Sequence, residues 1–460
     1  MEKRHLKHLY SRIGFGVLPS KLALLSDFNK TKVVSDLLHQ SKKMIPLEID
    51  LSDLAPMLSE KNKRTMSKEM RQKLQKISRK KIEAYNYLWI NRLANTNQLL
   101  REKMTLFWAN VFVCRDNNIF HVQQYNNTLR RHSLGDFKAF VKAVAREAAM
   151  SRYLNNRQNI KEKPNENFAR ELMELFTLGI GNYTENDIKE AARAFTGWSF
   201  KPNGDFFLRK KKHDYGVKTF MGKTGNFDGD DIIDIILEQK QCARFICSKI
   251  YRYFVNPKVN EIRLNELTDL FYKDYNTASL MKYILMTDWF YEESNIGVKI
   301  KSPIELLVGL LRIVPLRFEK KKQVLYLQKV MGQVLLNPPN VAGWLQDKNW
   351  IDSTTLLFRM KLPSVLLNDA IINVNQKGEF EDSFEAYYAK KKQAKKRIQV
   401  TRNWDVFNSE FVQLSDREIR DILVLSPIAK DTEMFLDTLA RVAKKEYVVQ
   451  IMSLPEYQLC

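Results

Sequence analysis

Turn-forming residues are scarce in this chain, and their scarcity restricts the folds that it can adopt. Its 460 residues include only 16 glycines and 13 prolines. A β-sandwich or barrel of many strands needs a turn about every ten residues, and glycine and proline supply many of those turns. Apolar residues recur at three- and four-residue intervals along most of the chain, which is the period of an α-helix. The sequence therefore predicts a mainly α-helical protein with a large multi-helix body.

Residues 200–225 depart from the helical period. They combine the aromatic pair Phe206-Phe207, a run of lysines and several glycines. We expect strand to be confined to a short β-hairpin or irregular insertion here. The tripeptide Gly222-Lys223-Thr224 lies in the same segment, but a phosphate-binding P-loop also needs a glycine five positions before Gly222, where Val217 stands. That motif is therefore excluded.

The next acidic and amide residues have part of the spacing of a calcium-binding loop. Asn226, Asp228 and Asp230 alternate as such ligands do, but the sixth position is Asp231 instead of glycine and the twelfth is Leu237 instead of glutamate. Capping of the following helix is the expected role of these side chains.

The sequence also bears on the compartment of the protein. Residues 1–10 contain no apolar core of a signal peptide, and no window reaches the roughly 18 uncharged apolar residues of a membrane span. The four cysteines form no CxxC pair, so they are expected to be buried thiols in a reducing compartment rather than zinc ligands. A soluble, cytoplasmic protein is predicted.

Positive charge is concentrated in two runs of a chain whose formal net charge is +22. Residues 61–81 form an amphipathic helix with a basic outer face that includes Lys73, Lys76 and Lys80, and residues 390–397 form a second run. One interpretation is a binding surface for an anionic partner such as nucleic acid. The other is a solvated face without a partner.

The centre of the chain predicts a helical hairpin. Asn165 is placed to cap a helix that begins at Glu166, and Gly179 and Gly181 are placed to form the turn. Residues 184–187 resemble a capping box that opens the second helix. On the first helix the charged residues recur every three or four positions.

Glu171 is the most informative of these charges, because it lies at the margin of the apolar face. A carboxylate at such a margin has a raised pKa or a partner, and both are ways in which sites acquire acids, bases or metal ligands. The alternative is an ion-pair ladder on one helix, with Arg170 between two glutamates. The candidate catalytic residues are Glu171, Glu174, His132 and Arg170. The candidate metal ligands are His213, Asp214 and Glu171.

Eight sequence blocks together resemble one bacterial family, called domain of unknown function 1800. The blocks are residues 99–108, 123–135, 164–183, 190–198, 218–228, 301–309, 337–344 and 454–460. The resemblance implies that residues 1–460 form one family domain. It can be subdivided into a helical N-terminal part (1–160), a motif-dense centre (161–260) and a helical C-terminal part (261–460). The family has no established reaction.

The chain departs from the family pattern at one place. The family typically has two histidines separated by one residue after the Phe-Trp pair, and here Ala109 and Val111 stand at those positions. Two histidines in this arrangement are common metal ligands. The resemblance therefore implies a divalent-metal site that is weakened by Ala109 and Val111.

Two functional hypotheses remain open from the sequence. The first is an enzyme with an altered or degenerate metal-assisted site in the central helical region. The second is a non-catalytic binding or assembly protein that uses its basic helices for an anionic partner such as nucleic acid.

Overall fold

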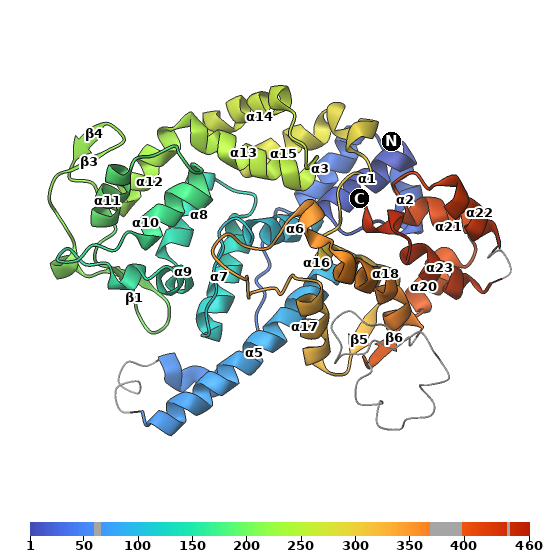
Figure 1. The fold of residues 1–460 in the computed structure, drawn as a ribbon, viewed down its shortest axis with the longest axis horizontal. Coiled ribbons are helices and arrows are strands. Elements are labelled where there is room, and N and C mark those ends of the chain that lie inside the picture. The colour runs from blue at the N-terminus through green and yellow to red at the C-terminus, as the bar shows by residue number, and fades with distance from the viewer. Residues whose placement is uncertain (59–65, 369–397, 439–441) are drawn as a thin grey trace.

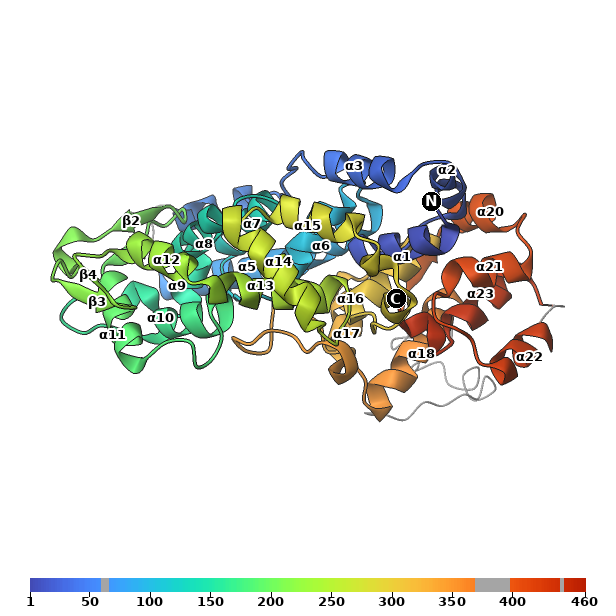
Figure 2. The same ribbon diagram turned by 90° about the horizontal axis from the view of Figure 1, so that it is seen from above.

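The computed structural model describes residues 1–58, 66–368, 398–438 and 442–460. Of these residues 62% are helical, so the predicted mainly α-helical class is confirmed. Figures 1 and 2 show an elongated body with α10–α12 at one end and α20–α22 at the other. The two ends of the chain lie near each other, beside α1, in both views. No helix of the described ranges is long and apolar enough to cross a membrane.

The first of two hydrophobic cores is built from the N-terminal and central helices. Its cluster of buried side chains runs from α1 to the short helix after α15. The contributing helices are α1 (Lys3–Ile13), α2 (Pro19–Ser26), α3 (Lys30–Gln40), α6 (Leu99–Trp108), α7 (Ile119–His132), α8 (Phe137–Arg146), α9 (Ala148–Tyr153), α10 (Asn167–Glu171), α11 (Glu185–Ala194), α12 (Gly229–Glu238), α13 (Lys240–Phe254), α14 (Glu261–Asp274) and α15 (Thr277–Met286).

The second core joins one early helix to the C-terminal helices. Leu106 of α6 and Ile119 and Val122 of α7 also belong to it, so the two cores adjoin along these helices. Its helices are α5 (Lys68–Asn95), α16 (Pro303–Ile313), α17 (Lys321–Val330), α18 (Ser353–Leu367), α20 (Asp405–Phe411), α21 (Asp416–Leu423), α22 (Lys430–Thr438) and α23 (Lys444–Met452).

Strand pairs occur where the sequence predicts them and also at one other place. Strands β1 (Trp198–Phe200) and β2 (Phe206–Leu208) form one antiparallel pair, and β3 (Lys218–Phe220) and β4 (Lys223–Gly225) form a second. The expectation that strand is confined to this region was wrong, because β5 (Leu316–Phe318) pairs with β6 (Val400–Arg402). Because these two segments are far apart in the sequence, no short turn motif between them predicts their pairing.

The helical hairpin of the centre is confirmed, with one change. Its first helix begins at Asn167, one residue later than predicted, although the Asn165 side chain still accepts a hydrogen bond from the Asn167 N–H (3.0 Å). Gly179 and Gly181 adopt φ of +84° and +83°, as a glycine turn requires. Thr184 and Asp187 form the capping box reciprocally. The hairpin is therefore encoded by local signals.

Capping and burial also agree with the sequence elsewhere. Asp228 caps α12 in a capping box with Asp231, which is the role expected in place of calcium binding. The cysteines at 114, 242, 247 and 460 are buried free thiols.

Candidate functional site

The first hairpin helix changes its winding where the candidate acids lie. After α10 ends at Glu171, residues Leu172–Thr177 form a π-helix, η3. The Leu178 N–H donates to the Met173 carbonyl (2.8 Å) and the Thr177 hydroxyl to the Leu172 carbonyl (2.6 Å), each across five residues. Such π-helical turns are rare and are frequent at functional sites.

Glu171 is a half-buried carboxylate beside this π-helix. It forms no hydrogen bond or ion pair with any residue that the structure describes. Burial raises the pKa of Glu171, and the negative charge of Glu174 raises it further. A half-buried acid without a partner is the state that the sequence pattern suggested for a catalytic or metal-binding group.

The neighbouring charges are engaged with each other across the hairpin. Arg170 forms a bidentate pair with Glu185 of α11 (2.8 and 2.9 Å) and a second pair with Glu166 (3.1 Å). Glu174 accepts a hydrogen bond from the Tyr183 hydroxyl (2.9 Å). The ion-pair alternative is therefore correct in part, because Arg170 does lie between two glutamates, but one of them comes from the second helix.

The candidate residues outside this helix have separate surroundings. His213 is buried and its Nδ1 lies 2.8 Å from the Thr196 carbonyl oxygen. Asp214 accepts a hydrogen bond from the Arg193 guanidinium (2.8 Å). His132 stacks on the Phe140 ring (5.7 Å between centroids), and burial lowers the pKa of this histidine.

These candidates do not assemble into a ligand set. Within residues 1–58, 66–368, 398–438 and 442–460, no group of three or more histidine, cysteine, aspartate or glutamate side chains could hold a metal ion. Neither His132 nor His213 bonds to Glu171.

The loop that departs from the family pattern packs against the π-helix. Ala109 ends α6, and Val111 is 4% exposed. The next residue, Phe112, packs edge-to-face on Phe176 of the π-helix (5.6 Å between centroids). The positions that the resemblance assigns to histidines therefore lie on a loop that adjoins the helix of Glu171 and Glu174.

The same loop leads into a buried polar cluster that the sequence analysis missed. The Nδ1 of His121 lies 3.0 Å from the Asp116 carboxylate, and Arg152 approaches the other oxygen of Asp116 (2.9 Å). Asp116 lies on the loop before α7, His121 on α7 and Arg152 on α9, so no single helical or strand face joins them in the sequence. Burial raises the pKa of Glu147, at the junction of α8 and α9, to about 7.

Burial raises the pKa of the Tyr153 hydroxyl; the charge of Arg115 lowers it, and the charges of Cys114 and Glu171 raise it. Burial likewise raises the pKa of the Cys114 thiol, with the charges of Asp116 and Glu147 adding to the effect.

The basic face of α5 is exposed, as predicted. In Figure 1 the N-terminal half of α5 extends away from the other long helices. Leu74 and Ser78 are buried, whereas Met70 is 46% exposed. Exposed basic residues on the side away from Leu74 and Ser78 are Lys68, Lys73, Lys76, Arg79 and Lys80, whereas the exposed Arg71 lies next to the buried side. Residues 61–65 and 390–397 of the two basic runs lie outside the described residues.

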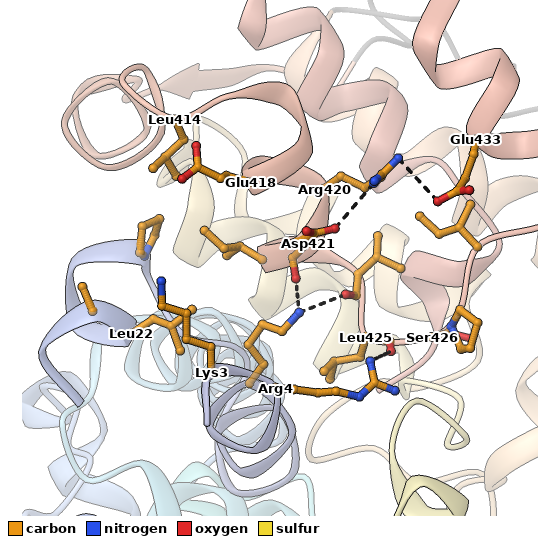
Figure 3. A pocket seen from close by; sticks show the side chains of 17 residues that line it. Lys3, Arg4, Leu22, Leu414, Glu418, Arg420, Asp421, Leu425, Ser426 and Glu433 are labelled. Carbon is orange, nitrogen blue, oxygen red and sulfur yellow. Dashed lines mark hydrogen bonds and ion pairs between the residues drawn. The ribbon is translucent and has the colours of Figure 1, made fainter. Parts of the chain in front are cut away.

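A cavity of about 600 Å³ lies between α1, α2 and the C-terminal helices. Figure 3 shows basic side chains of α1 reaching the backbone of the C-terminal segment, where Arg4 donates to the Leu425 carbonyl (3.4 Å) and Lys7 to the Val424 carbonyl (3.3 Å). Arg420 is 3.6 Å from the Glu433 carboxylate. Arg4 and Lys7 therefore join α1 to the C-terminal segment, whereas Arg420 and Glu433 pair within that segment.

Several of the quoted blocks meet through buried polar contacts. The Lys103 ammonium of block 99–108 donates to Glu305 of block 301–309 (2.5 Å). Asn110, just after the first of these blocks, accepts a hydrogen bond from the Trp344 N–H of block 337–344 (2.6 Å).

Comparison with known proteins agrees with this arrangement of blocks. A family model described as a protein of unknown function (DUF1800) matches residues 8–459. The chain belongs to the DUF1800 family. No curated protein and no solved structure matches it.

Proposed function

We propose that this DUF1800 protein binds nucleic acid through the outer face of α5. The observation that carries the proposal is a set of five exposed cations on a projecting helix, none of which pairs with another described residue. At 100° per residue they occupy an arc of about 140° on one side of the helix. They are Lys68, Lys73, Lys76, Arg79 and Lys80.

The dimensions of this face suit a phosphate backbone. From Lys68 to Lys80 the helix rises about 18 Å, at 1.5 Å per residue. One strand of a nucleic acid carries a phosphate about every 3.4 Å of duplex axis, so the face spans roughly five phosphates. The net charge of +22 would add long-range attraction to the same partner.

The experiment compares the protein with its Lys73→Gln/Lys76→Gln/Lys80→Gln variant in fluorescence-anisotropy titrations of a labelled duplex at several salt concentrations. With five phosphates neutralised, log K should fall with log salt at a slope of about −4.5, which is roughly 500-fold between 50 and 200 mM salt. The variant should show a slope of about −1.8 and only a roughly 12-fold loss over the same range.

A charge-matched control separates a local face from the general charge of the protein. Lys258, Lys273 and Lys282 are exposed lysines of the α13–α15 region, and their exchange for glutamine removes the same charge. This control should keep the steep slope. Equal losses in both variants, or no binding at 50 mM salt, would refute the proposal.

A second candidate function rests on Glu171. This acid has no partner among the described residues, its pKa is raised, and it adjoins the loop of Ala109 and Val111. On this hypothesis Glu171 and Glu174 belong to an altered metal-assisted catalytic site of the central region, with His132, His213 and Asp214 as the more distant members and Arg170 as a positioning group.

Restoring the histidines tests this candidate. The Ala109→His/Val111→His variant should gain affinity for zinc in a calorimetric titration, and adding Glu171→Gln should weaken that affinity again. Zinc binding that ignores the Glu171 exchange, or no binding by the restored pair, would remove this candidate and leave Glu171 as a structural acid.

A further inference from the structure

A second cavity, of about 280 Å³, lies where α6, α13, the start of α16 and the loop before α18 meet. Segments from four distant parts of the sequence line it, so it exists only in the folded chain. Its size is close to the lower limit of small-molecule pockets, which is about 300 Å³. It can therefore take a small ligand, and its lining decides which kind.

Polar groups that lack partners line this cavity. Gln333 is 4% exposed and its Oε1 accepts from the Ile304 N–H (3.0 Å), but its Nε2 donates to no described residue. The Tyr253 hydroxyl is buried with no hydrogen-bond partner in the described structure. Ser302 accepts a hydrogen bond from the Glu305 N–H (3.3 Å), and its own hydroxyl donates to no described residue. Of these three groups, the Tyr253 hydroxyl is a buried atom without any partner in the described structure. Leaving such a group unpaired is costly, so it points to a ligand that pairs with it from the cavity.

The charge around the cavity is positive. Lys299, 7% exposed, donates to both oxygens of Glu305 (3.0 and 3.1 Å), and Lys103 shares the same carboxylate. Two buried ammonium groups thus have one carboxylate between them. Arg252 and Lys348 also line the cavity, against Asp347 as an acidic lining residue.

The N-terminal end of α16 is already paired with a carboxylate. Ser302 is the N-cap of this 11-residue helix, and Glu305 in the first turn accepts a hydrogen bond from the Ser302 N–H (2.6 Å). The donors of the cavity are therefore its ammonium and guanidinium groups and three neutral side chains.

We propose that this cavity binds a phosphate group, either inorganic phosphate or the phosphate of a small phosphomonoester. A phosphate offers more acceptor oxygens than a carboxylate does, which matches the number of unpartnered donors. Arg252 and Lys348 are the cations at the cavity without a carboxylate partner in the described structure, and Lys299 supplies charge from the interior. The site is distinct from the outer face of α5 and does not depend on nucleic-acid binding.

The experiment is a calorimetric titration of the full chain with inorganic phosphate and, separately, with glycerol phosphate. The decisive variant is Tyr253→Phe, which removes a hydroxyl that bonds to nothing in the described structure and so leaves the fold intact. Loss of one hydrogen bond to a charged group should weaken phosphate binding roughly tenfold, with an unchanged thermal midpoint. Arg252→Gln should weaken it as well. Tighter binding of glycerol phosphate than of phosphate would identify an ester as the ligand class.

Two controls keep the result specific. Tyr326→Phe removes a half-buried tyrosine hydroxyl that does not line the cavity, and it should leave the affinity unchanged. The Lys73→Gln/Lys76→Gln/Lys80→Gln variant should also bind phosphate normally, even if it has lost nucleic acid. No heat with either ligand at millimolar concentration, or full affinity in Tyr253→Phe, would overturn the proposal.

Discussion

Glu147 is expected to lower the free energy of unfolding of this protein as pH rises. Its side chain lies at the junction of α8 and α9 and is 6% exposed. The Thr128 hydroxyl donates to its Oε1 (2.5 Å), whereas its Oε2 is buried without a partner. Burial is the largest cause of a pKa raised from 4.5 to about 7. The folded protein therefore holds this proton more tightly than the unfolded chain does.

The sign and size of the effect follow from linkage. Between pH 4.5 and 7 the folded state keeps the proton and the unfolded state loses it, so the free energy of unfolding falls as pH rises. The full cost is reached above pH 7. A pKa raised from 4.5 to about 7 corresponds to about 3 kcal/mol, most of which develops between pH 5 and pH 8.5.

Urea denaturation of the protein and of Glu147→Gln at a series of pH values measures this term. Glutamine keeps the acceptor for Thr128 and cannot ionise, so the variant should gain about 2–3 kcal/mol relative to the protein between pH 5 and pH 8.5. The exchange Glu292→Gln, at an exposed carboxylate, controls for the loss of one negative charge. A difference between Glu147→Gln and the protein that stays constant with pH would refute the reasoning.

Two further predictions concern the contacts between sequence blocks. Gly343→Ala should destabilise the fold by about 1–3 kcal/mol, because Gly343 has φ +89° and an added Cβ would lie 2.3 Å from the Asn110 Oδ1; an unchanged urea midpoint would contradict this. Glu305→Gln should cost about 3–5 kcal/mol, because it leaves the ammonium groups of Lys103 and Lys299 buried without their shared carboxylate. Thermal unfolding measures that loss, and a drop below about 1 kcal/mol would show that the ammonium groups release their protons or reach water.

The fold could be predicted where its signals are local. Thr184 and Asp187 are three residues apart, and Gly179 and Gly181 directly follow the first hairpin helix. The hairpin could therefore be predicted from the sequence. The π-helix could not be predicted in this way. It depends on which backbone carbonyl accepts a hydrogen bond from each N–H, and the Thr177 hydroxyl also donates to the Leu172 carbonyl. The β5–β6 pair depends on packing between segments far apart in the chain.

The candidate site likewise contains residues whose surroundings could be predicted from the sequence and residues whose surroundings could not. The position of Glu171 at the margin of an apolar face predicted a raised pKa or a partner, and in the described structure Glu171 is half-buried with a raised pKa. The surroundings of His213 could not be predicted, because they depend on the Thr196 carbonyl at the end of another element. The contacts of Asp116 with His121 and Arg152 could not be predicted, because the three residues lie on the loop before α7, on α7 and on α9.

Residues in the blocks that resemble the family form buried polar contacts with one another. The blocks therefore describe the fold more directly than they describe a function. Arg130 of block 123–135 donates to Glu102 of block 99–108 (2.6 Å), with both side chains fully buried. Breaking such a pair by changing one partner is strongly destabilising, so each block constrains the others through the fold. Recognition of the blocks is thus largely recognition of a scaffold.

Most of the groups proposed to bind ligands lie outside the blocks. These are the cations of α5 and Arg252, Tyr253, Gln333 and Lys348 of the small cavity, whereas Ser302 lies in block 301–309. At the family's expected histidine positions this chain has Ala109 and Val111. The variants at Lys73, Lys76, Lys80 and Tyr253 test the proposed ligand sites of this chain, whereas Gly343→Ala and Glu305→Gln test the contacts that hold its fold together.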